Sequence, residues 1–449
     1  MTFIDTFQTF FTESSQGVFD WYLAFGRPIL DSLNVFFTGA FNVFLGIAVG
    51  ISLLYYAVTL YHLLPSKRRV KIKEPAFDWD KAPSVSIQIP TRNELAALNC
   101  ARRCLDFDYP QEKLQIMIGD DSDIPDVSAK LQAFADKHET VTIYKREKNV
   151  GYKPGNLNNM LPHTTGEFLV IFDSDFLPET DFMRRIIAPF QYDDNLAVVQ
   201  ARWKPINPNE NLVTILGASI MISFHHLVCT FMQDFAGHAF LLGSAEAIRM
   251  KDLNDIGGWR QGSLTEDIEG SLRLIQQGKR FIYLRDLEVQ MEVPFDKKDL
   301  FKQQLRWAYG VAHTYKLHMK GLLTSGQKFK RLLAIFTFPA GFFFSFILSW
   351  LFLFGLLSFA THEPGPIDLA LFFGETARNI LLTSGVILTT IVATIREGRI
   401  LRYDKLLFAS FTYGLVVVYY VTVGIIKALT NQPMQWFILK KKGNESTIA

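Results

Sequence analysis

Short apolar runs alternate with amphipathic stretches through the central part of the chain. The runs have strand length and are rich in β-branched and aromatic residues: Val85–Ile89, Leu114–Ile118, Val141–Tyr144, Phe168–Phe172 and Leu196–Gln200. Stretches with helical spacing separate them, at about Glu94–Leu105 and Val127–His138. This alternation predicts a doubly wound, mostly parallel sheet with right-handed crossovers. We therefore expect an α/β fold in this region.

Two more helices are expected downstream of these strands. One begins at Gly243–Arg249. The other covers residues 264–278, where Ile268, Leu272 and Ile275 share one apolar face.

Both ends of the chain contain apolar stretches of a length that suits a membrane. Phe41–Leu64, Leu332–Ala360 and Leu406–Ile426 carry no Asp, Glu, Lys or Arg. At about 1.5 Å per residue, each can cross a hydrocarbon layer of about 30 Å. The shorter stretch Ile380–Ile395 spans only if its flanking arginines snorkel. Pro339 leaves open whether the second stretch is one helix or two, so the number of crossings is not fixed.

Basic clusters flank the central region on both sides. They are Lys67, Arg68, Arg69, Lys71 and Lys73 before it, and Lys328, Lys330 and Arg331 after it. The positive-inside rule then predicts that the central region is cytoplasmic. If all four stretches cross the membrane once, the Lys440–Lys442 tail lies on the non-cytoplasmic side, which the positive-inside rule disfavours.

These features divide the chain into five parts. We expect an amphipathic segment at residues 1–35, a transmembrane helix at 36–66, a cytoplasmic α/β domain at 67–320, interfacial and transmembrane helices at 321–430, and a tail at 431–449. The protein should be a multi-pass protein of the plasma (inner) membrane.

Composition narrows the functional classes. The formal net charge of +2 gives no reason to expect a nucleic-acid partner. There is no Gly-x-Gly-x-x-Gly after the first strand and no Walker loop, so the usual dinucleotide and ATP sites are not expected. The three cysteines are expected to be free thiols in a cytoplasmic domain.

Polar residues follow three of the predicted strands. They are Thr91–Glu94, Asp120–Ser122 and Asp173–Asp175. The carboxyl ends of parallel strands open onto one rim, where ligands bind. Two neighbouring carboxylates repel each other unless a cation lies beside them, and Mg²⁺ prefers oxygen ligands and leaves room for substrate phosphates. Asp173-Ser-Asp175 is therefore a candidate clamp for a metal ion and a diphosphate. The alternative is a solvated turn.

Three other segments carry candidate chemistry. Lys153 lies in a Gly-Pro turn and could contact a phosphate, or it could be an idle surface lysine. Asp267 lies in the first turn of a helix after Thr265, where helix propensity alone favours a plain capping role for an acid, although a general base would be held rigidly there. Gln303-Gln-Leu-Arg-Trp307 precedes the membrane, and an interfacial helix accounts for its Arg and Trp but not for its paired Gln.

In this order, these motifs resemble the D, DxD, TED and QxxRW signature of membrane-embedded family 2 glycosyltransferases, the group of cellulose and hyaluronan synthases. The matching residues are Asp120-Asp121, Lys153, Asp173-Ser-Asp175, Thr265-Glu-Asp267 and Gln303-Gln-Leu-Arg-Trp307. The resemblance covers roughly Ser84–Tyr315. It implies a GT-A-like fold, a nucleotide-diphosphate sugar donor (in the first place a UDP-sugar), Mg²⁺ or Mn²⁺, and inversion at the anomeric carbon.

The resemblance also implies roles for individual residues. Asp267 would be the catalytic base, with Glu266 beside it, and Asp175 and Asp173 would hold the metal ion. The donor site would comprise Thr91, Glu94, Asp120, Asp121, Lys153, Asp173, Gln303 and Arg306. The acceptor site would comprise Trp307, Gly243 and Ser244.

The leading hypothesis is a processive synthase that extends a β-linked polysaccharide and exports it through its own spans, with possible accessory export subunits. The visible spans are fewer than in cellulose synthase, which puts a long translocation channel in question. A non-processive glycosyltransferase with a ceramide, diacylglycerol or polyprenyl-phosphate acceptor is the alternative. A non-catalytic sugar sensor or scaffold subunit is a third reading, although the candidate ligands and base are all present.

Overall fold

The computed structural model describes residues 12, 15–18, 20–64, 74–363, 365–366, 368–398, 403–437 and 439–444. The chain forms two compact units, one of Met1–Leu54 and Phe343–Gly385, the other of Tyr55–Phe342 and Val386–Ala449. The basic cluster Lys67, Arg68, Arg69, Lys71 and Lys73 lies outside the described residues, as do residues 1–11, 13, 14 and 19 of the predicted N-terminal segment.

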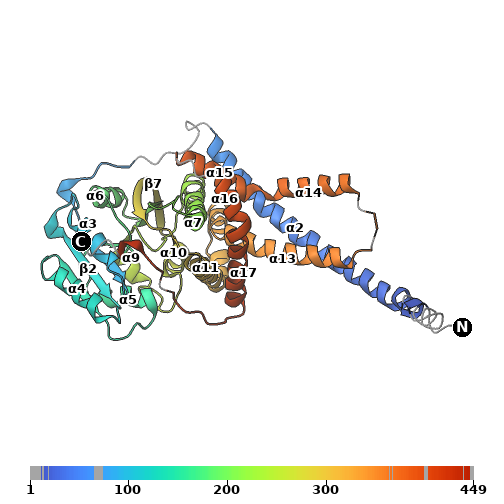
Figure 1. The fold of residues 1–449 in the computed structure, drawn as a ribbon. Helices are drawn as coiled ribbons and strands as arrows, with labels where there is room; N and C mark the ends of the chain where they lie inside the picture. Colours follow the sequence, from blue (N-terminus) through green and yellow to red (C-terminus); the bar gives the residue numbers. More distant parts are fainter. Residues whose placement is uncertain are drawn as a thin grey trace. The chain divides into compact units, whose positions relative to one another are not determined.

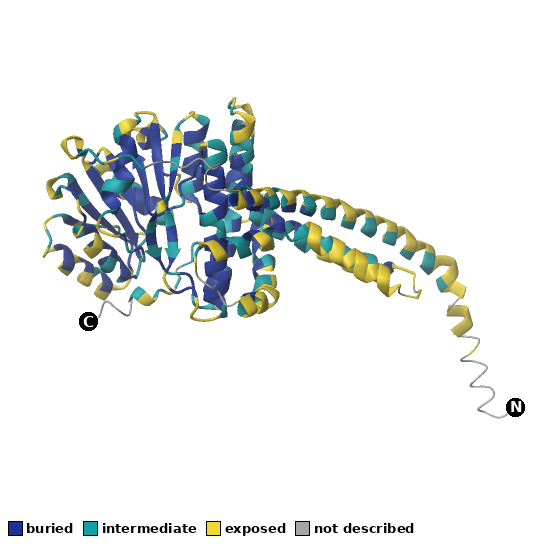
Figure 2. Ribbon diagram, turned by 90° about the horizontal axis from the view of Figure 1, so that it is seen from above, coloured by how far each residue is buried: buried dark blue, intermediate teal, exposed yellow. Residues whose placement is uncertain are grey.

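A seven-stranded sheet forms the centre of the second unit (Figure 1). Its strands are β1 (Val85–Thr91), β2 (Leu114–Asp120), β3 (Val141–Lys145), β4 (Phe168–Ile171), β5 (Leu196–Pro205), β6 (Glu246–Arg249) and β7 (Arg280–Met291), in the order β3-β2-β1-β4-β6-β5-β7. Every residue of β1 and β4 is buried, as Figure 2 shows for the strands in dark blue. Burial on both faces explains why these strands are continuous apolar runs. The predicted α/β fold and all five predicted strands are confirmed.

Helices pack against this sheet and continue beyond it. They are α3 (Ala96–Leu105), α4 (Pro125–Ala135), α5 (Tyr152–Met160), α6 (Phe182–Ile187), α7 (Leu212–Ser223), α8 (Thr230–Ala236), α9 (Met250–Asp255), α10 (Glu266–Gln276), α11 (Lys297–Thr324), α12 (Phe329–Thr337), α15 (Gly385–Arg396), α16 (Tyr403–Ala409) and α17 (Leu415–Leu429). Helix α17 lies along α11 (Figure 1). At Gly424 the two backbones approach so closely that a Cβ would lie 2.6 Å from the Leu305 carbonyl oxygen.

The prediction of a helix at Gly243–Arg249 is wrong. The last four residues form β6, which runs antiparallel between β4 and β5. A four-residue strand has too few positions to show a period, and here its two neighbours supply the hydrogen bonds that select the extended backbone. The expected helix over residues 264–278 is confirmed as α10.

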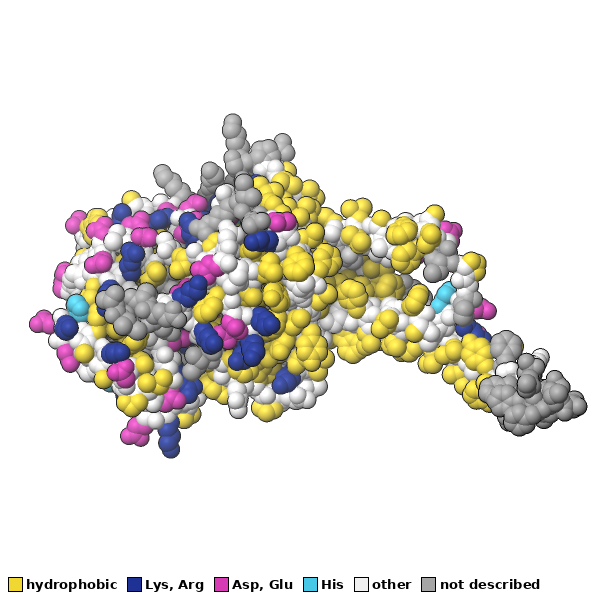
Figure 3. Space-filling view, viewed as in Figure 1, with side chains coloured by type: hydrophobic (Ala, Val, Ile, Leu, Met, Phe, Trp, Pro, Cys, Tyr) yellow, Lys and Arg dark blue, Asp and Glu magenta, His cyan; other side chains and the backbone are white. Residues whose placement is uncertain are grey.

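In the first unit, the part of helix α2 (Arg27–Leu63) up to Leu54 packs against the part of α13 (Ala340–Thr361) that begins at Phe343. The Asn34 side chain donates to the Ser358 carbonyl oxygen at 2.7 Å, and the Phe44 ring stacks on Phe354 with centroids 5.5 Å apart. Helices α13 and α14 (Leu369–Thr383) carry exposed apolar side chains, and Figure 3 shows such side chains in yellow. Phe359 of α13, for example, is 74% exposed. Contiguous exposed apolar surface along two helices indicates a contact with lipid or with another protein.

Among the described residues, four helices are long and apolar enough to span a membrane, or five if the pair α14 and α15, bent by 56°, forms one span. Helix α2 continues through residue 36, where the sequence suggested a boundary. The stretch Leu332–Ala360 is broken at Pro339, between α12 and α13. One of the four, Leu212–Ala236, had not been expected, and it is largely buried within the second unit.

Candidate active site

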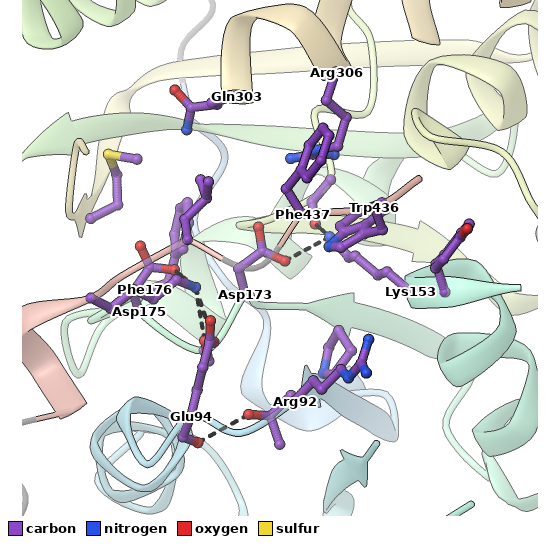
Figure 4. Close-up of a pocket in the computed structure, with 18 of the residues that line it drawn as sticks. Arg92, Glu94, Lys153, Asp173, Asp175, Phe176, Gln303, Arg306, Trp436 and Phe437 are labelled. Atoms are coloured by element: carbon purple, nitrogen blue, oxygen red, sulfur yellow. Dashed lines mark hydrogen bonds and ion pairs between the residues drawn. The ribbon is translucent and has the colours of Figure 1, made fainter. Parts of the chain in front are cut away.

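A cavity of about 180 Å³ lies at the carboxyl ends of β1, β2 and β4 (Figure 4). The loops after these strands form one side. The turn before β6, the first turn of α10 and the face of α11 form the other, and residues from the C-terminal tail cover it. Segments far apart in the sequence thus meet at the rim where an open α/β sheet binds ligands.

Asp121 is fixed at the cavity wall by Arg146. The guanidinium donates from Nε to Asp121 Oδ1 at 2.7 Å, and its Nη2 pairs with the other carboxylate oxygen. It also donates to the carbonyl oxygens of Val150 and Tyr152, at 2.8 and 3.2 Å. Arg146 therefore joins the carboxylate to the loop that leads into α5.

Asp120, which the resemblance also assigns to the donor site, does not line the cavity. Its side chain is buried, accepting from the Ser122 backbone at 2.8 Å and from the Ser128 hydroxyl at 2.5 Å. Successive side chains of a strand point to opposite faces, so only one of the two aspartates can face the cavity.

Lys153 lies between three elements of the site. Its Nζ is 2.6 Å from Asp173 Oδ1, 2.6 Å from the Gly243 carbonyl oxygen and 3.4 Å from Glu266 Oε1. Burial alone would lower the pKa of Lys153, but the charges of Asp173 and Glu266 outweigh burial and raise it. The lysine is therefore a fixed positive charge at neutral pH.

The C-terminal tail supplies a second cation. Lys441 Nζ lies 2.8 Å from Asp175 Oδ1, 2.9 Å from Ser174 Oγ and 3.2 Å from Glu94 Oε2. Asp175 and Glu94 raise the pKa of Lys441 in spite of burial. Because the tail contacts the site, both lie on one side of any membrane, so the arrangement in which all four predicted stretches cross once is wrong.

Two aromatic residues of the tail complete this cover. The Arg306 guanidinium lies over the Trp436 ring, 4.1 Å from its centroid, and Trp436 stacks on Tyr152 at 6.2 Å. Phe437 also lines the cavity (Figure 4).

The site fits a divalent ion held together with a phosphorylated ligand. Among the described residues, no group of three His, Cys, Asp or Glu side chains could hold a metal ion by itself. Asp173 and Asp175 provide two carboxylates, and Mg²⁺ typically uses one or two carboxylates together with substrate phosphates. Asp175 already pairs with a positive charge, the Lys441 ammonium, which a metal ion would have to displace.

Asp267 is the second residue of α10, and the backbone of Gly243 lies close to its carboxylate. Its Oδ1 accepts from the Ile268 N–H at 2.8 Å, and a Cβ on Gly243 would lie 3.0 Å from its Oδ2. Burial, followed by the charge of Glu266, raises the pKa of Asp267 to about 7, while Lys153 and Arg306 partly offset the shift. The carboxylate can therefore both take up and release a proton near neutral pH.

Helix α11 presents Gln303, Arg306 and Trp307 to the cavity. Spacings of three and four residues place them on one helical face. The Arg306 guanidinium donates from Nη1 to the Leu264 carbonyl oxygen at 3.2 Å. Burial lowers the pKa of Arg306, although Glu266, Asp173 and Asp267 oppose the shift.

The cavity brings together most of the predicted site residues. Its lining includes Thr91, Glu94, Asp121, Lys153, Asp173, Asp175, Gly243, Glu266, Asp267, Gln303, Arg306 and Trp307. Asp120 and Ser244 are not in the lining, although Ser244 Oγ accepts from the Asp173 N–H at 2.9 Å. Sequence reasoning missed Arg92, Tyr152, Trp203, Trp436 and Lys441. In the sequence, an aromatic residue close to the basic run Lys440–Lys442 could have indicated that the tail contributes to the site.

Known proteins share parts of this chain. The chain is 33% identical over 293 residues to glucomannan 4-beta-mannosyltransferase 2 of Arabidopsis thaliana, covering 61% of this chain and 52% of that protein. It is 31% identical over 253 residues to glucomannan 4-beta-mannosyltransferase 1 of Oryza sativa subsp. japonica, covering 54% and 48%. The chain thus spans about half the length of the curated relatives it matches.

A solved structure shares the fold. It is a mannosyltransferase from Pyrobaculum calidifontis in complex with GDP-Man and Mn²⁺, with a TM-score of 0.58 and 18% identity, covering 90% of this chain and 99% of that one.

Two family models match the chain. The model of glycosyl transferase family 2 matches residues 86–238, which include β1 to β5. The model of glycosyl transferase family group 2 matches residues 168–395, more than half of the chain. This protein therefore belongs to glycosyl transferase family group 2.

Proposed function

We propose that this protein is an inverting membrane glycosyltransferase that transfers a hexosyl group, in the first place mannosyl, from a nucleotide-diphosphate sugar to a β-linked polysaccharide. The observation that carries the proposal is that Asp121, Asp173, Asp175, Asp267 and Arg306 line a single cavity. The mannosyltransferase relatives and the GDP-Man complex of the structural neighbour support the choice of sugar.

On the donor side, Asp121 and Thr91, which line the cavity, would contact the nucleoside. Arg306 and Lys153 would bind the diphosphate, and their two positive charges would stabilise the negative charge that develops on the leaving oxygen. Asp173 and Asp175 would hold a divalent ion, Mg²⁺ or Mn²⁺, which when bound neutralises further charge on the diphosphate. No proton donor is needed for such a leaving group.

On the acceptor side, Asp267 would remove the proton from the attacking hydroxyl. The bond from the acceptor oxygen to the anomeric carbon forms as the bond to the diphosphate breaks, so a single displacement inverts the configuration. Gly243 lies next to the Asp267 carboxylate and Trp307 lines the same cavity, and both would orient the acceptor sugar.

The C-terminal tail covers the cavity and leaves less space for the donor to enter. Ligand pockets for molecules of drug size usually have about 300–1,000 Å³, whereas this cavity has about 180 Å³ with the tail in place. Lys441 and Trp436 would therefore move when the donor binds. We place the active site on the cytoplasmic side of the plasma (inner) membrane, because the basic residues Lys328, Lys330 and Arg331 precede the apolar helix α13 in the chain.

The test uses the purified full chain in nanodiscs with Mn²⁺ and a panel of GDP- and UDP-sugars. Release of GDP from GDP-mannose, together with a high-mass product that β-mannanase degrades, is the expected result. A high-mass product from a UDP-sugar would change the sugar but keep the reaction. Only singly glycosylated lipid would favour the lipid-acceptor alternative, and no release from any donor would overturn the proposal.

A further inference from the structure

A buried acid that belongs to none of the sequence motifs holds the turn next to Asp267. Glu246 begins β6 and is 1% exposed. Its Oε2 accepts from the Leu242 N–H and from the Gly243 N–H, both at 2.8 Å. One carboxylate oxygen thus binds two successive backbone amides of the turn Leu242–Ala245.

This turn is under backbone strain. Gly243 has φ 92°, and Ala245 has φ 51°, a left-handed conformation that a residue with a Cβ rarely adopts. Such conformations persist only where the surrounding contacts enforce them. Glu246 supplies two of these contacts, and Gln200, its cross-strand neighbour, accepts from Leu242 N–H at 2.9 Å and donates to the Ser244 carbonyl oxygen at 2.9 Å.

The turn contacts three residues of the proposed mechanism. The Gly243 carbonyl oxygen accepts from Lys153 at 2.6 Å, and the Gly243 Cα faces Asp267. Ser244 Oγ accepts from the Asp173 backbone at 2.9 Å. A displacement of the turn would therefore move the lysine, the base and a metal ligand together.

We propose that Glu246 is a positioning residue for the transfer reaction: through its two backbone hydrogen bonds it holds the Leu242–Ala245 turn in the shape that presents Gly243 to Lys153 and leaves space for Asp267. The inference rests on the proposed function. Burial, followed by the charge of Asp267, raises the pKa of Glu246 to about 8, so a neutral side chain of the same shape can take its place.

The experiment compares three variants of the full chain with the wild type, in nanodiscs, by steady-state release of the nucleoside diphosphate. Glu246→Ala removes both hydrogen bonds and should lower kcat by about 10- to 100-fold, while the donor KM changes by less than about threefold, since displacing a catalytic group by about 1 Å has effects of this size. Glu246→Gln keeps an oxygen that accepts both bonds and should restore kcat to within about threefold of wild type.

Ser271→Ala is the matched control. Ser271 is buried, and its Oγ accepts from the Leu241 N–H at 2.9 Å, one residue before the turn. This variant also leaves one buried amide without its acceptor, but it should keep kcat within about threefold. If Glu246→Ala does not fold, Glu246→Asp takes its place, because it keeps the acid and shortens its reach by one methylene.

A Glu246→Ala variant with wild-type kcat would overturn the inference, as would a Glu246→Gln variant as slow as Glu246→Ala, because hydrogen bonding would then not explain the loss. An equal fall in Ser271→Ala would show that any lost amide acceptor has the same effect, and would overturn it too. If the wild type releases no nucleoside diphosphate from any sugar, the proposed function fails and this role with it. An active wild type with an equally active Glu246→Ala removes only the role of Glu246.

Discussion

The protonation of Asp267 should control both activity and stability around neutral pH. Its pKa is raised from 3.8 to about 7, chiefly by burial and then by the charge of Glu266. As the proposed base, Asp267 must be ionised to accept a proton, so activity should be lost as the pH falls through about 7. At pH 6 about one tenth of the carboxylate remains ionised, and kcat/KM for the donor should be about tenfold below its alkaline plateau.

The raised pKa of Asp267 also affects the stability of the folded protein. A displacement from 3.8 to about 7 corresponds to about 4 kcal/mol between the two protonation states. Between these values the folded state binds the proton more tightly than the unfolded state, so stability decreases as the pH rises from about 4 to about 7. Asp267→Asn should therefore raise the melting temperature at pH 8 and change it little at pH 4, while abolishing most of the activity.

The assay is diphosphate release between pH 5.5 and 8.5, for wild type and for Glu266→Gln. Removing the charge of Glu266 should move the acid limb of the kcat/KM pH profile to lower pH, because that charge raises the pKa of Asp267. Glu112→Gln, at an exposed position outside the cavity lining, should leave the limb in place. A kcat/KM that is flat from pH 5.5 to 8, or a limb that Glu266→Gln does not move, would refute this reasoning.

Three other changes separate the roles of the site residues. Asp175→Ala should abolish metal-dependent donor binding, measured by calorimetry, whereas Asp267→Asn should retain binding and lose about 10²–10⁴-fold in kcat; equal loss of affinity in both would contradict this division. Lys441→Met removes the cation from Asp175 and should lower the Mn²⁺ concentration for half-maximal activity, and an unchanged Mn²⁺ titration would argue against competition. Gly243→Ala places a Cβ 3.0 Å from Asp267 at a φ of 92° and should lower kcat by about 10- to 100-fold, a prediction that near-normal turnover would contradict.

The sheet and its rim could be predicted because their determinants are local. Buried parallel strands are recognisable as continuous apolar runs, and the rule that ligands bind beyond their carboxyl ends places Asp121 and Asp175 near each other. Asp267 could be placed because the periodicity of α10 fixes which residues form its first turn. These inferences need only a short window of sequence.

The remaining features depend on contacts between distant segments. Glu246 is in a strand only because β4 and β5 flank it, so its backbone hydrogen bonds cannot be read from its neighbours in the chain. Lys441 reaches Asp175 because α17 packs along α11 and directs the tail toward the cavity. In the sequence, the tail was interpreted as an indicator of membrane topology, since basic residues near apolar helices commonly have that role.

The close contact at Gly424 joins an apolar helix, α17, to the helix α11 that carries Arg306 of the site. Helix α17 belongs to a stretch that is apolar enough to lie in a bilayer, and its backbone touches the turn of α11 that carries Arg306. A helix adjusts its tilt when the hydrocarbon layer becomes thinner or thicker, and with no side chain at Gly424 to absorb that adjustment, the arginine would move with it. Acyl-chain length should therefore affect the rate of the proposed sugar transfer, so nanodiscs made from short and long lipids should differ in turnover even when every substrate is saturating.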